Sequence, residues 1–326
     1  MLFDFFIIAI GFFLLVKGAD FLIKGSAIIA KKFGLSEMII GLTIVSIGTS
    51  LPEIFITIKS ALQGHSELII GNAIGSSICN FLFVIGISSI FRPIKVDKRI
   101  NKIHIPIGIG AMLLVMLLAD INLFSGSNTL ARWQGIVLII FTLLYILYTI
   151  YEEKNNINKK GNNDKVDIID NDKEKNTHAW KIALYIILGC VMLKIGSDFV
   201  VDHAIHIAES FNLTQRVISM TIIAIGTALP EIVTSIIASL KGESDLILGN
   251  MAGSNILNLC LLIGLGAIIS PMPFSKDFNA SILLLIVVTI IINVISTMDK
   301  EKSINRSKGI ILILIYVLYI LNLFRV

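Results

Sequence analysis

The sequence predicts an all-α polytopic membrane protein with ten transmembrane helices, arranged as two inverted-topology repeats of five helices. Three observations predict it: long apolar runs, a low content of charge, and a set of motifs repeated at one fixed offset. Of the 326 residues, 55% are hydrophobic and 15% are charged, and the mean hydropathy is +0.87. Soluble chains carry roughly 25% charged residues, so the composition excludes an ordinary soluble enzyme.

Ten apolar runs have the length of about 20 residues that a helix needs to cross a bilayer core of about 30 Å. The first and sixth runs are longer than a perpendicular crossing requires, which predicts that these two helices are tilted. The first run lacks a basic leader and a small-residue cleavage site, so we expect a retained helix rather than a signal peptide. The runs fall at residues 3–31, 36–62, 67–91, 103–119, 130–151, 180–208, 214–240, 245–270, 280–297 and 308–324.

Residues 152–178 separate the two groups of five runs. This segment is rich in Asn, Lys and Asp and almost free of large apolar side chains, so it cannot bury a core and is expected to be a solvated linker. The chain therefore divides into a first half (1–151), the linker and a second half (179–326). The formal net charge of +4 favours neither nucleic-acid binding nor a polybasic lipid clamp. Cys79, Cys190 and Cys260 lie in apolar runs without a CxxC pair, which predicts free thiols.

The two halves contain matching motifs. IGTSLPEI at 47–54 returns as IGTALPEI at 225–232, and GNAIGSSICN at 71–80 returns as GNMAGSNILN at 249–258. The offset is 178 residues in both cases, and it also relates Asp20 to Asp198. One offset held without a gap indicates a duplicated five-helix unit. Because five is odd, the halves must enter the membrane from opposite sides, which is typical of secondary transporters.

The distribution of basic residues predicts the orientation. With the amino terminus outside, nineteen Lys and Arg residues fall in inner loops and five fall outside. The positive-inside rule therefore predicts that both termini are outside and that the linker is cytoplasmic. The expected location is the plasma membrane of the cell.

A proline and a glutamate interrupt the second helix of each half. Pro52 and Pro230 have no N–H to donate within the helix, so each is expected to free the carbonyl four residues earlier. A freed carbonyl at mid-membrane is tolerated where it lines a cavity or meets a cation. Glu53 and Glu231 follow the prolines directly, and intramembrane carboxylates are costly and typical of ion pathways. The two glutamates are therefore expected to face each other across the pseudo-twofold axis.

Each third helix carries a polar stripe. Asn72, Ser76 and Asn80 are spaced i, i+4 and i+8, so they share one helix face, and Asn250, Ser254 and Asn258 repeat the stripe. A single polar stripe is often interhelical packing, but two stripes beside two glutamates favour an ion site. Carboxylate, amide, hydroxyl and carbonyl oxygens suit hard cations such as Ca²⁺ or Na⁺.

These paired motifs resemble the two alpha-repeats of the calcium/cation antiporter superfamily, and the length and short linker resemble its compact prokaryotic sodium/calcium exchangers. The resemblance implies that Ca²⁺ lies between Glu53 and Glu231 and the carbonyls of Thr49 and Thr227. It also implies flanking sodium sites and a central asparagine of the first repeat, Asn80. The positions that match the sodium sites are Ser46, Ser50 and Ser76 in the first half, and Ala224, Thr227 and Ser254 in the second.

Two positions depart from the family pattern. Asn258 stands where some relatives carry an aspartate associated with potassium dependence, so two carboxylates remain and potassium co-transport is disfavoured. Ala228 stands opposite Ser50 and removes a hydroxyl, which is expected to weaken one sodium site.

Two further groups of polar residues allow a structural and a functional interpretation. Asp20 is expected near the inner interface, where Lys24 can pair with it, and a role in gating is the alternative. His203 and His206, with Asp202 and Glu209, fall near the outer end of the sixth helix. A solvated helix face is the main expectation for them, and a zinc site is the alternative.

The sequence therefore predicts a secondary-active antiporter that exchanges Ca²⁺ for Na⁺, with the lipid bilayer as its surroundings and no resident cofactor. A Ca²⁺/H⁺ antiporter of the same superfamily is the first alternative, because buried carboxylates also bind protons. A channel or an intramembrane enzyme is the second. No Ser-His-Asp order, Walker loop or Gly-rich nucleotide turn occurs in the sequence, which disfavours an enzyme and nucleotide binding.

Overall fold

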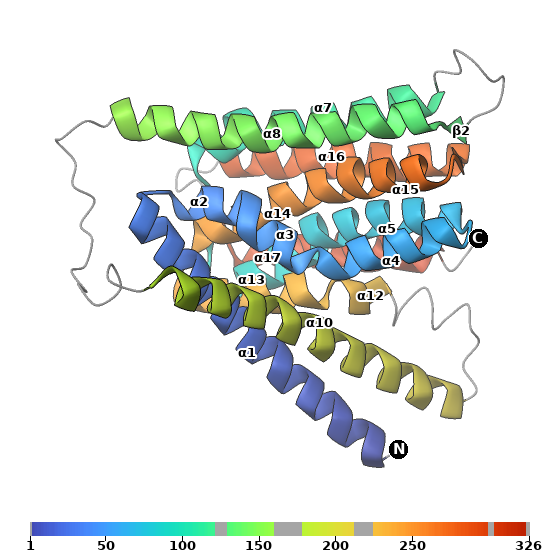
Figure 1. Cartoon of the computed structure of the whole chain (residues 1–326), viewed down its shortest axis with the longest axis horizontal. Coiled ribbons are helices and arrows are strands. Elements are labelled where there is room, and N and C mark those ends of the chain that lie inside the picture. The colour runs from blue at the N-terminus through green and yellow to red at the C-terminus, as the bar shows by residue number, and fades with distance from the viewer. Residues whose placement is uncertain (1, 121–128, 160–177, 212–223, 299–302, 324–326) are drawn as a thin grey trace.

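The chain folds into long helices joined by short turns (Figure 1). The computed structural model describes residues 2–120, 129–159, 178–211, 224–298 and 303–323. The helical elements of the first half are α1 (Leu2–Phe33), α2 (Glu37–Ile40), η1 (Gly41–Val45), α3 (Ser46–Thr49), α4 (Leu51–Leu62), α5 (Ser66–Cys79), η2 (Asn80–Val84), α6 (Ile85–Phe91), η3 (Ile100–His104), α7 (Ile105–Asp120) and α8 (Arg132–Lys159). The elements named η are π-helical turns.

The second half repeats this order of elements. Its helical elements are α10 (Ala179–Ser210), α12 (Ala224–Thr227), α13 (Leu229–Lys241), α14 (Ser244–Ile256), η5 (Leu257–Leu262), α15 (Ile263–Ile269), α16 (Lys276–Met298) and α17 (Arg306–Leu323). Most of the predicted linker, and residues 214–223 at the start of the predicted seventh span, lie outside the described residues.

Two short antiparallel ladders join the halves. β1 (Ile94–Lys95) pairs with β4 (Ser303–Ile304), and β2 (Thr129–Leu130) pairs with β3 (Met272–Pro273). Each ladder takes one strand from each half, so the loops after the third helices are fixed to the opposite half of the chain.

The helices are long and apolar, as a membrane fold requires. Among the described residues, seven are long and apolar enough to cross a membrane, or eight if α2–α3 and α4 form one bent span. The described part of α13 is short, and α17 is a helix but is not among these seven. Large apolar side chains such as Phe5, Phe13 and Leu318 are exposed on the outer faces, which in a membrane contact lipid rather than water. The structure is therefore an all-α polytopic membrane fold.

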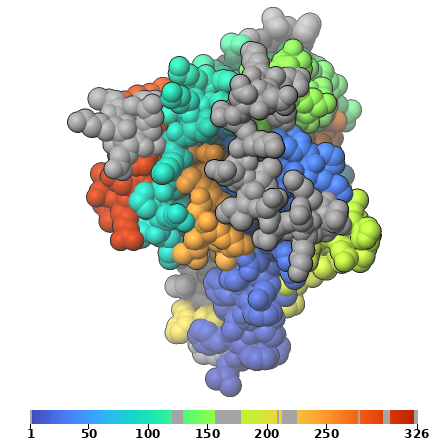
Figure 2. Space-filling view, turned by 90° about the vertical axis from the view of Figure 1, so that its left-hand side faces the viewer, coloured from blue at the N-terminus to red at the C-terminus, as the bar shows by residue number. Residues whose placement is uncertain are grey.

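Helices α1 and α10 cross the other long helices obliquely (Figure 1). Figure 2, viewed from the end where α1 finishes, shows α1 in blue projecting from the rest of the molecule. The tilt expected from the length of these two helices is therefore present.

Glycines bring α1 and α10 into backbone contact. A Cβ at Gly18 would lie 2.9 Å from the carbonyl of Gly189, and one at Gly189 would lie 2.9 Å from the carbonyl of Gly18. Gly11 and Gly196 meet in the same reciprocal way, at 2.9 and 2.7 Å. Such close approach is typical of small residues at helix contacts in membranes. The two helices therefore pack as one unit.

The interior is formed by α14 against α2, η1 and α3, with α5 and α15 beside them. Gly249 and Gly253 allow this contact, because a Cβ there would lie 2.3 Å from the Met38 carbonyl and 2.5 Å from the Leu42 carbonyl. The three cysteines are free, as predicted.

Candidate ion-binding site

A break divides the second helix of each half where the GT-x-LPE motif lies. Helix α3 ends at Thr49 and α4 starts at Leu51, and the two axes differ by 47°. Ser50 between them has φ −84° and ψ 6°, and Ala228 at the equivalent position has φ −87° and ψ 0°. These values lie in the sparsely populated bridge region. Proline at the second position of α4 and of α13 fits the start of a new helix, where its missing N–H costs nothing.

The two glutamates are fully enclosed. Glu53 is 0% exposed and Glu231 is 1% exposed, and the two carboxylates are close enough to repel each other. Neither oxygen of Glu53 has a hydrogen-bond partner within the described protein, and one oxygen of Glu231 also has none. Buried carboxylate oxygens without partners are very costly in a finished fold, so these atoms mark a place where a cation is expected.

The polar stripes lie against the broken helices. Asn80 starts the π-helical turn η2, and Asn258 lies in the equivalent turn η5. Both asparagines are buried, and neither atom of either amide has a hydrogen-bond partner in the described part of the chain. π-Helical turns of this kind are frequent at functional sites. The structure thus places both predicted stripes beside the glutamates.

Hydrogen bonds between the halves follow the repeat. The Thr49 hydroxyl donates to the Asn250 amide oxygen over 3.3 Å. Adding 178 to one position and subtracting it from the other gives Thr227 and Asn72, whose side chains are linked over 3.5 Å. Each broken helix therefore contacts the polar stripe of the opposite half.

The hydroxyl of Ser50 makes two contacts across the repeats. It lies 3.3 Å from Oε1 of Glu231 and 3.4 Å from Oγ of Ser254. The equivalent partners of Ala228 are Glu53 and Ser76, and Ala228 has no hydroxyl to offer them. The Ser76 hydroxyl is buried without a hydrogen-bond partner among the described residues. The expected effect of Ala228 is thus visible as an asymmetry of the site.

The remaining predicted residues lie on the same elements. The Ser46 hydroxyl is buried and donates to the carbonyls of Leu42 and Thr43, at 2.8 and 3.0 Å. Thr227 is 7% exposed at the end of α12. Ala224 begins α12, and its side chain lies outside what the structure describes.

One of the two carbonyls expected to be free is engaged. The Gly226 carbonyl accepts a hydrogen bond from the Ser197 hydroxyl of α10 over 2.8 Å. It therefore does not face a cation, because a neighbouring helix supplies the donor that Pro230 lacks. In the first half the residue equivalent to Ser197 is Ala19, which has no hydroxyl.

Two hydroxyls escaped the sequence prediction. Thr57 and Ser235 are related by the same offset of 178 and lie one helical turn after Glu53 and Glu231. Both are at most 1% exposed, and neither hydroxyl has a hydrogen-bond partner in the described part of the protein. The i+4 spacing after each glutamate was the signal that could have identified them.

The other polar residues pair differently from the expectation. Asp20 forms an ion pair with Lys241 of α13 over 2.6 Å, while the predicted partner Lys24 lies over the ring of Tyr185. The prediction was wrong because the crossing of α1 and α13 brings a distant lysine closer. His203 likewise is not part of a fully solvated face, because Asp4 of α1 lies 2.8 Å from its Nδ1.

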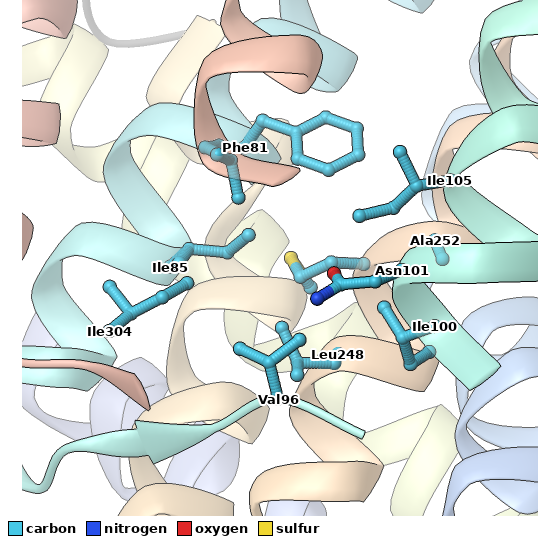
Figure 3. Close-up of a pocket in the computed structure, with 11 residues that line it drawn as sticks. Phe81, Ile85, Val96, Ile100, Asn101, Ile105, Leu248, Ala252 and Ile304 are labelled. Atoms are coloured by element: carbon cyan, nitrogen blue, oxygen red, sulfur yellow. The ribbon is translucent and has the colours of Figure 1, made fainter. Parts of the chain in front are cut away.

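A small cavity near the site is almost wholly apolar. It is lined by Phe81, Ile85, Ile105, Leu248 and neighbouring aliphatic side chains, with Asn101 as the polar member (Figure 3). Neither glutamate lines it. It therefore offers no set of oxygen ligands and is not the candidate ion site.

Known proteins share this sequence and fold. A family profile described as "Sodium/calcium exchanger protein" matches residues 3–151 and 181–325. CaxA of Alkalimonas amylolytica, which bears the name of an antiporter, is 33% identical over 273 residues and 83% of each chain. The sodium/calcium exchanger MaX1 of Methanosarcina acetivorans is 28% identical over 307 residues, with 85% of this chain and 86% of MaX1 covered.

A solved structure extends the likeness to three dimensions. The sodium-calcium exchanger NCX_Mj, soaked with Na⁺ and Sr²⁺, superposes with a TM-score of 0.80 and 27% sequence identity, and 97% of each chain is covered. The matched profile covers both halves of the chain and leaves out most of the linker. The chain therefore belongs to the sodium/calcium exchanger family, a family of membrane cation transporters within the calcium/cation antiporter superfamily.

Proposed function

We propose that this protein exchanges Ca²⁺ for Na⁺ across the membrane by alternating access. The observation that carries the proposal is the pair of buried carboxylates, Glu53 and Glu231, surrounded by polar side-chain atoms without hydrogen-bond partners. Two negative charges balance one Ca²⁺, and oxygen ligands suit this hard cation. The printed functions of MaX1 and NCX_Mj support the same pair of ions.

The proposed ligands divide between Ca²⁺ and Na⁺. Glu53 and Glu231 bind Ca²⁺ together with the backbone carbonyls of Thr49 and Thr227. The flanking sodium sites use the same carboxylates with nearby hydroxyl, amide or backbone oxygens. Their residues are Ser46, Ser50, Ser76, Asn80, Ala224, Thr227, Ser254 and Asn258, where Ala224 can offer only its backbone carbonyl.

Sharing the glutamates explains why the transport is an exchange. Ca²⁺ and a full load of Na⁺ compete for the same two carboxylates, so they do not occupy the site together. A site with two bare carboxylates is too costly to expose to the membrane interior. Only a loaded site therefore changes its access, and each crossing of Ca²⁺ requires a return crossing of Na⁺.

The proposed architecture has ten spans in two inverted halves, 1–151 and 179–326, with a cytoplasmic linker at 152–178 and both termini outside. The reciprocal contacts Thr49–Asn250 and Thr227–Asn72 support the inverted repeat, because one rotation relates them. The glycine contacts between α1 and α10 support a unit that moves as one body against the helices of the site.

A Ca²⁺/H⁺ exchange is the second candidate. It is favoured by the surroundings of Glu53, whose two oxygens have no donor among the described side chains because Ala228 lacks the hydroxyl of Ser50. A buried carboxylate without donors can be neutralised by a proton as well as by a cation.

The two candidates differ in the gradient that drives calcium. The purified protein is placed in proteoliposomes, and ⁴⁵Ca²⁺ uptake is measured under an outward Na⁺ gradient, an outward H⁺ gradient or neither, with the membrane potential clamped. Uptake driven by Na⁺ alone is expected. Uptake driven by H⁺ without Na⁺ would replace the proposal by the second candidate, and uptake that ignores both gradients would contradict exchange.

A further inference from the structure

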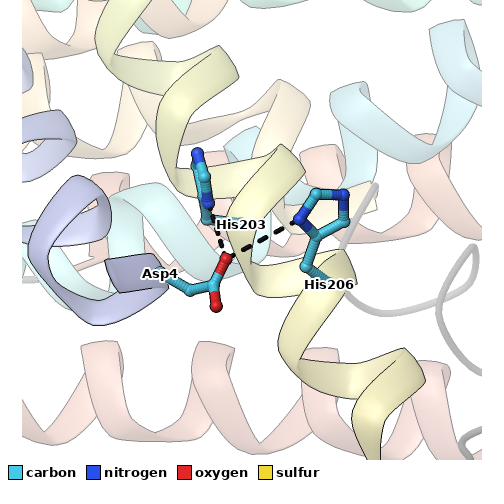
Figure 4. A group of neighbouring side chains, drawn as sticks. All are labelled: Asp4, His203 and His206. Carbon is cyan, nitrogen blue, oxygen red and sulfur yellow. Dashed lines mark hydrogen bonds and ion pairs between the residues drawn. The ribbon is translucent and has the colours of Figure 1, made fainter. Parts of the chain in front are cut away.

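Asp4, His203 and His206 form a cluster outside the candidate ion site. Asp4 lies in the first turn of α1, and the two histidines lie near the end of α10 (Figure 4). Oδ1 of Asp4 is 2.8 Å from Nδ1 of His203 and 3.7 Å from Nδ1 of His206. One donor atom from each residue falls within 4.8 Å of the others, and the described residues contain no other such group. The helix crossing thus gathers three metal-binding groups.

The three groups have the chemistry of a transition-metal site. Imidazole nitrogen and carboxylate oxygen are common zinc ligands, with metal–ligand distances of about 2.0–2.2 Å. Ligands around one such ion are then roughly 3.3 Å apart, so the observed spacings need only small side-chain rotations. His203 and His206 are three residues apart, which places them on the same face of α10.

The surroundings leave one side of the cluster open. The side chain of His206 is 65% exposed, whereas those of His203 and Asp4 are 19% and 16% exposed. The ring of Phe3 meets the His203 ring edge-on at 5.8 Å, which limits the rotation of that imidazole. Two ligands are therefore held in place, and the third is accessible to an ion from solution, with water free to complete the coordination.

We propose that Asp4, His203 and His206 bind a divalent transition-metal ion of the Zn²⁺ class and thereby link the start of α1 to the end of α10. The site is distinct from the glutamates, because nitrogen ligands favour Zn²⁺ over the oxygen-seeking Ca²⁺ and Na⁺. The binding adds a bridge between two helices that already meet through their glycines. It does not depend on which ion the glutamates transport.

The test measures Zn²⁺ binding to the full-length protein after complete removal of any histidine tag. Equilibrium dialysis at micromolar free Zn²⁺, with Ca²⁺ in excess, is expected to give one bound ion per chain. His206→Ala is expected to weaken the affinity by roughly tenfold or more. Because the His206 side chain is largely exposed, this substitution leaves the fold intact. His65→Ala and Asp202→Asn, which change a histidine and a carboxylate outside the cluster, are the matched controls and are expected to bind like the parent.

A second measurement reports the bridge itself. Zn²⁺ is expected to raise the melting temperature of the parent and of the double variant Glu53→Gln/Glu231→Gln, and to leave that of His206→Ala unchanged. Failure of the proposed exchange therefore leaves this result intact. No Zn²⁺ binding by the parent, or equal affinity of the parent and His206→Ala, would overturn the proposal and leave Asp4–His203 as a simple tether between two helices.

Discussion

The hydroxyl of Ser50 in the first half lies 3.3 Å from a carboxylate oxygen of Glu231 in the second half. The pseudo-symmetric contact would join residue 228 to Glu53, but residue 228 is alanine. Both oxygens of Glu53 and the hydroxyl of Ser76 consequently lack hydrogen-bond partners among the described residues. The two halves of the site thus offer a cation different numbers of hydroxyl groups.

Ala228→Ser is therefore expected to add a ligand on the poorer side of the site. Ala228 is buried at the same kind of break as Ser50, so a serine there can reach Glu53 and Ser76. One neutral contact is worth about 1 kcal/mol, which predicts that half-maximal exchange needs roughly fivefold less Na⁺. The measurement is the Na⁺ dependence of ⁴⁵Ca²⁺ exchange in proteoliposomes.

Ser50→Ala serves as the opposite control for this prediction. It removes the existing hydroxyl and is expected to raise the Na⁺ requirement by a similar factor. If Ala228→Ser and the parent need the same Na⁺ concentration while Ser50→Ala differs, residue 228 does not face the ion.

Glu53→Gln and Glu231→Gln are each expected to abolish calcium exchange while the protein still inserts and folds. Each substitution removes one of the two charges that face the ion and preserves the shape of the side chain. Loss of a charged ligand at a buried site costs several kcal/mol, which corresponds to exchange below detection. Glu67→Gln, on an exposed carboxylate of the neighbouring α5, is the control and should exchange like the parent. Clear calcium exchange by either site variant would place the ion elsewhere.

The contacts of the site could be predicted from the sequence because the repeat offset is exact. One offset of 178 residues relates Thr49–Asn250 to Thr227–Asn72, and both contacts exist. The break at Ser50 also follows from local chemistry, since Pro52 cannot donate a backbone hydrogen bond. Local rules and internal symmetry were sufficient for this part of the molecule.

Contacts that depend on how helices cross could not be predicted. Asp4 and His203 are 199 residues apart in the chain, and Asp20 and Lys241 are 221 apart. No repeat relates these pairs, because their equivalents carry different side chains. Their meeting depends on the tilt of α1 against α10 and α13, which packing of the whole bundle decides. The same reason explains why Ser197 was not expected to satisfy the carbonyl of Gly226.

Gly189→Val tests whether α1 and α10 act as one packed unit. A Cβ at this position would lie 2.7 Å from the backbone nitrogen of Leu22 and 2.9 Å from the carbonyl of Gly18, so valine must push the helices apart. Overpacking of this kind costs about 1–3 kcal/mol, and we expect a lower melting temperature and slower exchange. Gly108→Val, where a Cβ meets no atom within 4 Å, is the control. Equal stability of the two variants would contradict the close helix contact.

Glu243 gives the stability of the protein a pH dependence near neutrality. Burial in the turn between α13 and α14, together with the charge of Glu37, raises the pKa of Glu243 from its ordinary 4.5 to about 7, although Lys241 and Lys31 act against this rise. The folded protein therefore holds this proton more tightly than the unfolded chain. The stabilising contribution of that proton is complete below about pH 4.5 and is lost as the pH rises through about 7.

The melting temperature of the parent is accordingly expected to fall between pH 6 and pH 8, as measured by thermal unfolding in detergent. Glu243→Gln, which is neutral at every pH, should show a smaller fall over the same range, and Glu67→Gln should keep the slope of the parent. A slope unchanged in Glu243→Gln would assign the dependence to another group.

Asn258 offers the sharpest test of how many charges the site tolerates. The side chain is fully buried in η5, and neither atom of its amide has a hydrogen-bond partner among the described residues. Asn258→Asp adds a third carboxylate near Glu53 and Glu231. Carboxylates this close cannot all stay ionised, so one must take up a proton or recruit a monovalent cation. We therefore expect calcium exchange by Asn258→Asp to become more sensitive to pH or to K⁺ than that of the parent. Asn258→Ala removes only a neutral oxygen and is expected to reduce exchange less than Glu53→Gln or Glu231→Gln does. Calcium flux titrated against pH and against K⁺ in both variants measures these effects. If Asn258→Asp matches the parent in both titrations, the amide packs the helix and does not line the ion site.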